Sequence, residues 1–104
     1  YVSLADLVFD GHGTKISYSK ANKMYKKAYQ KGIKESAIGY GLSCLFIKGK
    51  EEVGIELLKT IYDVNSYLIN KVLGLCYESN IGTQRDTEKS KKFLKAAELV
   101  KNIE

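Results

Sequence analysis

The chain has 104 residues, of which 44% are hydrophobic, 28% are charged and none is proline. This composition predicts one folded domain and excludes a disordered chain, and no apolar run is long enough to insert into a membrane. The net charge is +5, but Arg85 is the only arginine among 17 basic residues. Because lysine lacks the planar fork that contacts bases and phosphates bidentately, we expect no nucleic-acid partner.

Without proline the chain can be helical nearly throughout, and its glycines mark the turns. The sequence also repeats itself. Ala5 and Ala28 are 23 positions apart, as are Gly74 and Ala97, and the apolar residues and lysines between them fall in step. Gly41 begins an intermediate copy, 36 positions after Ala5 and 33 before Gly74. We therefore predict a single all-α domain, an α/α solenoid of three helix–turn–helix repeats at approximately residues 1–32, 33–64 and 65–101.

The same pattern of packing residues is predicted in each repeat. Its first helix carries a small residue where the neighbouring helix approaches closely, at Ala5, Gly41 and Gly74. Its second helix places a bulky pair between two smaller positions on one helical face. These bulky pairs are Met24-Tyr25, Leu57-Leu58 and Phe93-Leu94, and we expect Tyr25, Tyr62 and Tyr77 to be core residues. Turns are predicted at residues 11–13, Gly32, Gly49 and residues 80–82, and Asp86 is predicted to cap the last helix.

The third repeat carries the clearest motif, Leu73-Gly74-x-x-Tyr77-x-x-x-x-Gly82, followed by a short loop with Asp86 and then by Lys89-x-x-x-Phe93-x-x-Ala96-Ala97. This pattern resembles a Sel1-like repeat, a branch of the tetratricopeptide superfamily. The second copy matches in part, since its loop is three residues shorter. The resemblance implies a right-handed superhelix that scaffolds protein complexes, with no cofactor and no catalytic activity. It also implies a bacterial protein, either cytoplasmic or exported.

In stacked helical repeats the first helices line the concave surface. On these helices, the positions that are not committed to packing form an apolar centre with polar flanks, which is typical of a protein-binding groove. The predicted partner-binding residues are Asp6, Phe9 and Asp10 in the first repeat, Ile38, Leu42, Leu45 and Phe46 in the second, and Lys71, Leu75 and Glu78 in the third. The competing interpretation is that some of the apolar ones, Leu42 in particular, pack between repeats.

The leading functional hypothesis is a non-catalytic module that binds another protein. One concrete form is a bacterial immunity or inhibitor protein that occludes a toxin or effector. The alternative is a fragment or a self-associating scaffold, because Leu99, Val100 and Ile103 place apolar residues where a terminal cap should be polar.

Residues with reactive side chains form no pattern typical of a catalytic or metal site. His12 is the only histidine and has no second ligand at a suitable spacing. Cys44 and Cys76 are expected to be free buried thiols, and a disulfide between them is the alternative in an exported protein. A stripe of lysines is interpreted as a solvated helix face, or alternatively as a patch that attracts an acidic partner. It consists of Lys20, Lys23, Lys27, Lys31 and Lys34.

Overall fold

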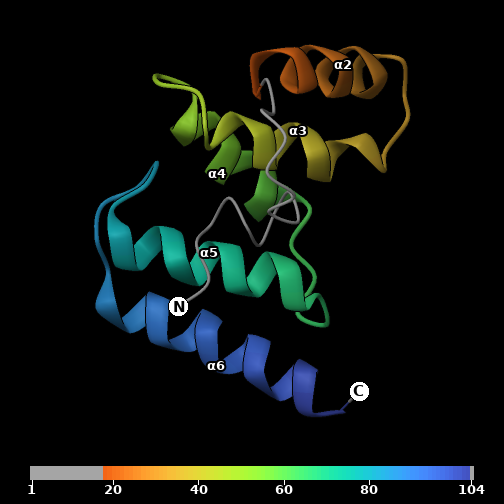
Figure 1. The fold of residues 1–104 in the computed structure, drawn as a ribbon. Helices are drawn as coiled ribbons and strands as arrows, with labels where there is room; N and C mark the ends of the chain where they lie inside the picture. Colours follow the sequence, from red (N-terminus) through yellow and green to blue (C-terminus); the bar gives the residue numbers. More distant parts are fainter. Residues whose placement is uncertain (1–17, 104) are drawn as a thin grey trace, which may run out of the picture. The chain divides into compact units, whose positions relative to one another are not determined.

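The computed structural model describes residues 18–103, and the regular secondary structure of this part of the chain is entirely helical (Figure 1). The helices are α2 (Tyr18–Gln30), α3 (Ser36–Cys44), α4 (Glu51–Thr60), α5 (Tyr67–Ser79) and α6 (Thr87–Ile103). The all-α prediction is confirmed, whereas the arrangement as a three-repeat solenoid stays a prediction. None of the described helices is both long and apolar enough to cross a membrane.

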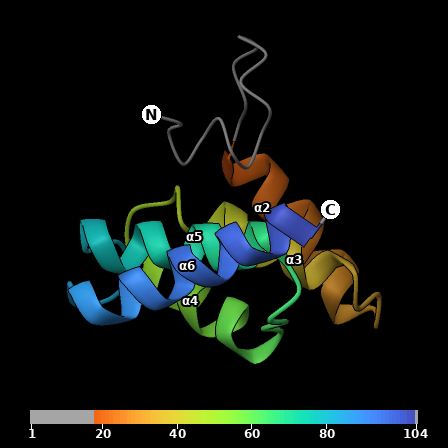
Figure 2. The same ribbon diagram turned by 90° about the horizontal axis from the view of Figure 1, so that it is seen from below.

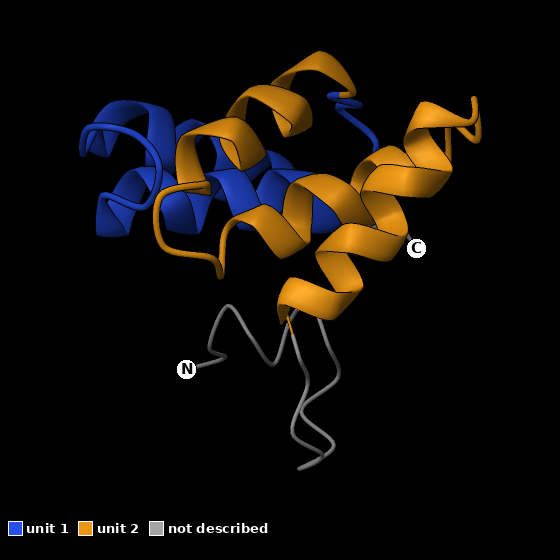
Figure 3. Ribbon diagram, turned by 90° about the horizontal axis from the view of Figure 1, so that it is seen from above, with its two compact units in different colours: residues 1–14, 62–104 blue, residues 15–61 orange. Residues whose placement is uncertain are grey.

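The chain divides into two compact units, coloured separately in Figure 3. One unit, Lys15–Ile61, contains α2, α3 and α4, and we call it the α2–α4 unit. The described residues of the other unit begin at Tyr62 and contain α5 and α6; we call it the α5–α6 unit. The division after Ile61 falls close to the predicted end of the second repeat.

Local signals end the helices where the sequence predicts. Gly32, Gly49, Asn80 and Gly82 all have positive φ, so the predicted turns at these positions are confirmed. Asn80 ends α5 in the left-handed conformation, and the Ile81 amide then donates to the Cys76 carbonyl at 3.0 Å. The predicted cap of α6 is confirmed too, since Asp86 Oδ1 accepts a hydrogen bond from the Lys89 amide at 3.0 Å.

Within the α2–α4 unit, α3 and α4 approach through glycine. A methyl group added to Gly54 would lie 2.7 Å from the Gly41 carbonyl oxygen and 3.0 Å from Cys44 Cβ and Leu45 Cδ2. A methyl group on Gly41 would lie 3.2 Å from Leu58 Cδ2. The predicted close approach at Gly41 is therefore confirmed, and it brings the fully buried Leu58 against α3.

In the α5–α6 unit the two helices also approach closely at a glycine, but the facing residues are a leucine and a serine. The two helices run side by side in Figure 2, and a methyl group on Gly74 would lie 2.6 Å from Leu94 Cδ2 and 3.2 Å from the Leu94 amide nitrogen. Ser90 Oγ donates a 2.9 Å hydrogen bond to the Gly74 carbonyl. Ser90 and Ala97 are buried, which confirms the predicted packing role of these two small residues.

Aromatic side chains join α2 to α3. Tyr18 stacks on Phe46 with ring centroids 4.7 Å apart, and Tyr29 lies 5.8 Å from Tyr40. The ring of Tyr25 also covers Gly39, so a methyl group added there would meet the ring unless the ring moved aside. Tyr18 at the start of α2 thus lies beside Phe46, just after α3, and Tyr29 near the end of α2 lies beside Tyr40, earlier in α3, so the two helices are antiparallel.

The core prediction is confirmed for one of three tyrosines. Tyr77 is 3% exposed and stacks on Phe93, but Tyr25 and Tyr62 are each 39% exposed, so the prediction that these two are core residues is wrong. Met24 is 69% exposed, so the prediction that it fills an interhelical groove is wrong. The reason is that the face of α2 that packs on α3 contains Tyr25 and Asn22, and Met24 lies at its edge, about 100° from Tyr25 around the helix.

We expect Gly54→Ala to lower the free energy of unfolding by about 1–2 kcal/mol. The overpacking penalty of about 1–3 kcal/mol exceeds the gain of about 0.5–1 kcal/mol from replacing a mid-helix glycine, because the nearest atom belongs to backbone that cannot rotate away. Gly39→Ala is the matched comparison, since the half-exposed Tyr25 ring can swing aside, and it should cost less. Urea titrations followed by circular dichroism measure both, and equal stability of Gly54→Ala and wild type would contradict the close approach.

Candidate partner-binding surface

Of the four predicted residues of the second repeat, two are buried, one is half-buried and one is exposed. Leu42 and Leu45 are each 5% exposed, and Leu45 packs against Gly54 on α4. Their assignment to a partner-binding surface is corrected: in this structure they are core residues. The physical reason is that α3 has nine residues and packs against both α2 and α4, so most of its apolar circumference is used inside the unit.

Ile38 and Phe46 remain accessible at opposite ends of this segment. Ile38 is 38% exposed at the start of α3. Phe46 follows the end of α3, is half-buried, and has one ring face covered by Tyr18. A partner could therefore reach Ile38 directly and could reach only part of the Phe46 ring.

The predicted residues of the third repeat all retain some exposure. Lys71 and Leu75 are half-buried and Glu78 is exposed, and their spacing of four and three places them on one face of α5. Asp6, Phe9 and Asp10, together with His12, lie outside the described residues. The structure therefore supplies geometry for seven of the ten predicted residues.

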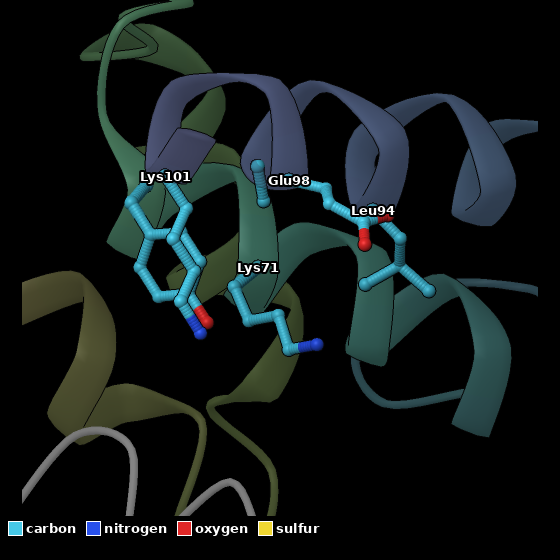
Figure 4. A pocket seen from close by; sticks show the side chains of 6 residues that line it. Lys71, Leu94, Glu98 and Lys101 are labelled. Atoms are coloured by element: carbon cyan, nitrogen blue, oxygen red, sulfur yellow. The ribbon is translucent and has the colours of Figure 1, made fainter. Parts of the chain in front are cut away.

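Lys71 lines a small pocket between α5 and α6 (Figure 4). Its volume is about 180 Å³, and Leu94, Glu98 and Lys101 come to it from α6. Lys101 Nζ lies 6.0 Å from the ring centroid of Tyr67, within range of a cation–π contact. Two ammonium groups and one carboxylate around an apolar floor make this a charged pocket of small capacity.

Sequence reasoning missed the apolar surface of the α2–α4 unit. Five large hydrophobic residues within 15 positions are 38–69% exposed: Met24, Tyr25, Tyr29, Ile33 and Ile38. They come from α2, the turn that follows it and the first turn of α3. Because Tyr25 covers Gly39 and Tyr29 contacts Tyr40, the two tyrosines border the contact between α2 and α3. We call these five residues the apolar seam.

A buried polar network joins α2 to α3. The Asn22 side-chain amide donates to Ser43 Oγ at 3.0 Å and to Cys44 Sγ at 3.1 Å, and its oxygen accepts from Lys50 Nζ at 3.4 Å. Asn22 is 1% exposed, and this network connects α2, α3 and the residue before α4. All polar atoms of the Asn22 side chain are thus satisfied inside the unit, which favours a role in packing.

Both cysteines are free and buried, as predicted. Burial raises the pKa of Cys44, against the opposing effects of the Asn22 hydrogen bond and of the positive charges on Lys50 and Lys26. Burial alone raises the pKa of Cys76 from 9.0 to about 12. Because the thiolate is the nucleophilic form, neither thiol is prepared for attack on a substrate at neutral pH.

Among the described residues, histidine, cysteine and carboxylate side chains do not gather in any group of three that could hold a metal ion. Comparison of the chain with protein-family models, with curated proteins and with solved structures finds no match.

The raised pKa of Cys76 predicts a loss of stability at alkaline pH. The folded chain keeps the thiol proton up to about pH 12, whereas the unfolded chain loses it near pH 9. This contribution is fully present below pH 9 and declines as the pH rises towards 12. Cys76→Ala lacks this contribution at every pH. The difference in free energy of unfolding between wild type and Cys76→Ala should therefore be smaller above pH 9 than at neutral pH.

Val72→Ala is the matched control for this experiment, because Val72 is equally buried on the same helix and does not titrate. Its stability gap to wild type should stay constant with pH. Urea titrations of the three proteins across the pH range provide the measurement. A Cys76→Ala gap as constant as that of Val72→Ala would contradict the assigned shift.

Proposed function

We propose that this chain is a non-catalytic module that binds another protein, and that it is a helical-repeat protein of the Sel1-like, tetratricopeptide-related type. The observation that carries the binding role is the apolar seam on the α2–α4 unit. Isolated exposed apolar residues are ordinary, but a concentration of large ones along one helix pair is typical of an interaction site.

The repeat assignment is supported by equivalent contacts in the two hairpins. Gly41 meets Gly54 and Leu58 in α3–α4, and Gly74 meets Ser90 and Leu94 in α5–α6. The second set of partners lies 36 positions after the first, and Gly74 lies 33 positions after Gly41. Two copies of one helix–turn–helix unit would make the same contacts in both hairpins. The two offsets differ because the loop between the two helices is longer in the second hairpin.

The proposed binding surface differs from the one that the sequence suggests. Ile38 remains part of it, and the buried Leu42 and Leu45 are replaced by Tyr25, Tyr29 and Ile33. Tyrosine is enriched at the centre of protein interfaces because it combines a large apolar ring with one hydroxyl group. Ile33 and Ile38, at 50% and 38% exposure, supply the aliphatic contacts beside the rings.

A bacterial immunity or inhibitor protein that occludes a toxin or effector is the concrete form that we propose for this module. Occlusion requires a stable surface and no chemistry of its own, in keeping with two buried thiols of raised pKa. A second candidate is a self-associating scaffold. It is favoured by Leu99, which is 56% exposed near the end of α6 and would pair with another copy or another repeat.

The binding role predicts that Ile33→Glu combined with Ile38→Glu abolishes capture of the native partner. Two carboxylates at the centre of an apolar interface should weaken binding by about a hundredfold or more, since unpaired buried charges cost several kcal/mol. The tagged 104-residue chain is incubated with lysate of its own organism, and the captured proteins are quantified by mass spectrometry.

Val53→Glu combined with Val64→Glu is the matched control, because these valines are 46% and 56% exposed and the charge change is the same. The control should keep the partner that the Ile33→Glu/Ile38→Glu variant loses. If both folded variants captured the same set as wild type, the apolar seam would not be the binding surface. A toxin or effector encoded beside this gene would be the first candidate to test for occlusion.

A further inference from the structure

The chain between α4 and α5 is attached to α5 through one buried side chain. Asn70 is 0% exposed, and its amide donates to the carbonyls of Val64 and Ser66, both at 2.9 Å. Its oxygen accepts a 2.7 Å hydrogen bond from the Tyr62 hydroxyl. One residue thus bonds to three of the residues from 62 to 66, which lie between α4 and α5 in Figure 1. We call residues 62–66 the strap.

The strap forms a turn before the chain enters α5. The Asp63 carboxylate accepts from the Asn65 amide and the Asp63 carbonyl accepts from the Ser66 amide, both at 2.9 Å. The Ser66 hydroxyl then accepts from the Ile69 amide at 3.2 Å and caps α5. The two bonds to Asp63 are internal to the strap, so they give it a shape but do not attach it to a helix.

Little apolar burial supports the strap. Residues 62–65 are all exposed, and the Val64 side chain is 56% exposed. The aromatic ring of the strap, Tyr62, is 39% exposed and meets Phe93 edge to face with ring centroids 5.6 Å apart. A segment with few buried apolar contacts opens locally at a small fraction of the free energy of global unfolding. The bonds to Asn70 therefore contribute a large share of what keeps the strap in place.

The helix that follows the strap is packed much more tightly. Val72, Leu73 and Cys76 on α5 are each 0% exposed, and Gly74 lies against Leu94 of α6. Asn70 belongs to the beginning of α5, before these residues. Breaking its bonds to the strap leaves the α5–α6 packing unchanged, so the strap can open while both helices stay folded.

We propose that the strap has a clamped and a released state, that it changes between them as one unit, and that Asn70 is the clamp. In the released state the three bonds to the Asn70 side chain are broken together. Five residues in an extended conformation span roughly 17 Å, so release allows the connection from α4 to α5 to lengthen. This conformational device goes beyond the proposed binding function, since it lets the chain change shape without unfolding a helix pair.

Hydrogen exchange of the 104-residue chain, followed residue by residue by NMR, tests the proposal. The reporters of release are the Ser66 backbone amide and the Asn70 side-chain amide, and the reporters of the helix are the backbone amides of Leu73 and Cys76. We expect the two release reporters to share one protection factor. It should be at least about tenfold lower than that of the helix reporters, because release requires no helix to unfold.

Two variants weaken the clamp by different amounts. Asn70→Asp keeps the size of the side chain but turns its two donors into a carboxylate oxygen, which repels the carbonyls of the strap. At neutral pH it should lower the protection of the Ser66 amide about tenfold or more, and part of this protection should return at acid pH, where the carboxyl group can donate again. Tyr62→Phe keeps the ring beside Phe93, loses one bond and should lower the same protection severalfold.

Each variant has a matched control in the α2–α4 unit. Asn22→Asp makes the same change at an asparagine that is 1% exposed, and Tyr25→Phe makes the same change at a tyrosine that is 39% exposed, as Tyr62 is. Both controls should leave the protection of the Ser66 amide within about twofold of wild type, because neither residue bonds to the strap.

Three results would overturn the proposal. The first is equal protection of the Ser66 and Leu73 amides in wild type, because the strap would then open only together with α5. The second is a loss of Ser66 protection that is as large in Tyr25→Phe as in Tyr62→Phe. The third is an equal loss of protection at Ser66 and Leu73 in both Asn70→Asp and Tyr62→Phe, since Asn70 would then stabilise the helix and not the strap.

Discussion

In the α3–α4 hairpin the carbonyl of Gly41 lies so close to Gly54 that no side chain larger than hydrogen fits between the helices. In the α5–α6 hairpin Gly74 occupies the corresponding position, and the Ser90 hydroxyl donates to its carbonyl. The close packing of the two helix backbones in each hairpin determines which neighbouring side chains are buried in the core. Leu58 becomes fully buried beside Gly41, and Leu94 covers Gly74. The remaining faces of the same helices are left for solvent or for partners.

Buried amide side chains fix the packing that the glycines permit. Asn70 accepts from the Tyr62 hydroxyl at 2.7 Å and donates to the carbonyls of Val64 and Ser66, both at 2.9 Å. Asn70 thus fixes the loop of residues 62–66 to the first turn of α5, whereas Asn22 joins α2 to α3. A slip of α2 along α3 by one residue would leave the Asn22 amide unpaired in an apolar surrounding, at a cost of about 1–3 kcal/mol. Within the described residues every buried side-chain nitrogen and oxygen has a partner.

The sequence predicts the turns and the close contacts well because both have local causes. Positive φ at Gly32 and Gly82 and the caps at Asn80 and Asp86 depend on a few adjacent residues. Gly74 has no side chain, and a glycine within a helix predicts that another helix packs closely there. Burial of an apolar residue depends instead on what covers it. Periodicity places Leu42 and Leu45 on an apolar face, but it does not say that α2 and α4 together use up that face.

The same limitation applies to the candidate site. Met24 and Phe93 hold equivalent positions in the repeat pattern, yet Met24 is 69% exposed and Phe93 is half-buried and stacks on Tyr77. This difference in exposure depends on how α2 packs against α3, and no single residue of α2 determines that packing. The positively charged face of α2, by contrast, can be predicted from the sequence, because lysines spaced by three and four residues lie on one face of any helix.

The two thiols provide one internal reporter for each compact unit. Cys44 lies in Lys15–Ile61 and Cys76 in the unit that contains α5 and α6, and both side chains are almost fully enclosed. A disulfide reagent can modify either sulfur only after that part of the chain opens, so the rate of modification follows the free energy of local opening. Single-cysteine variants would thus show which hairpin unfolds first, and whether the two open together as one cooperative body or separately.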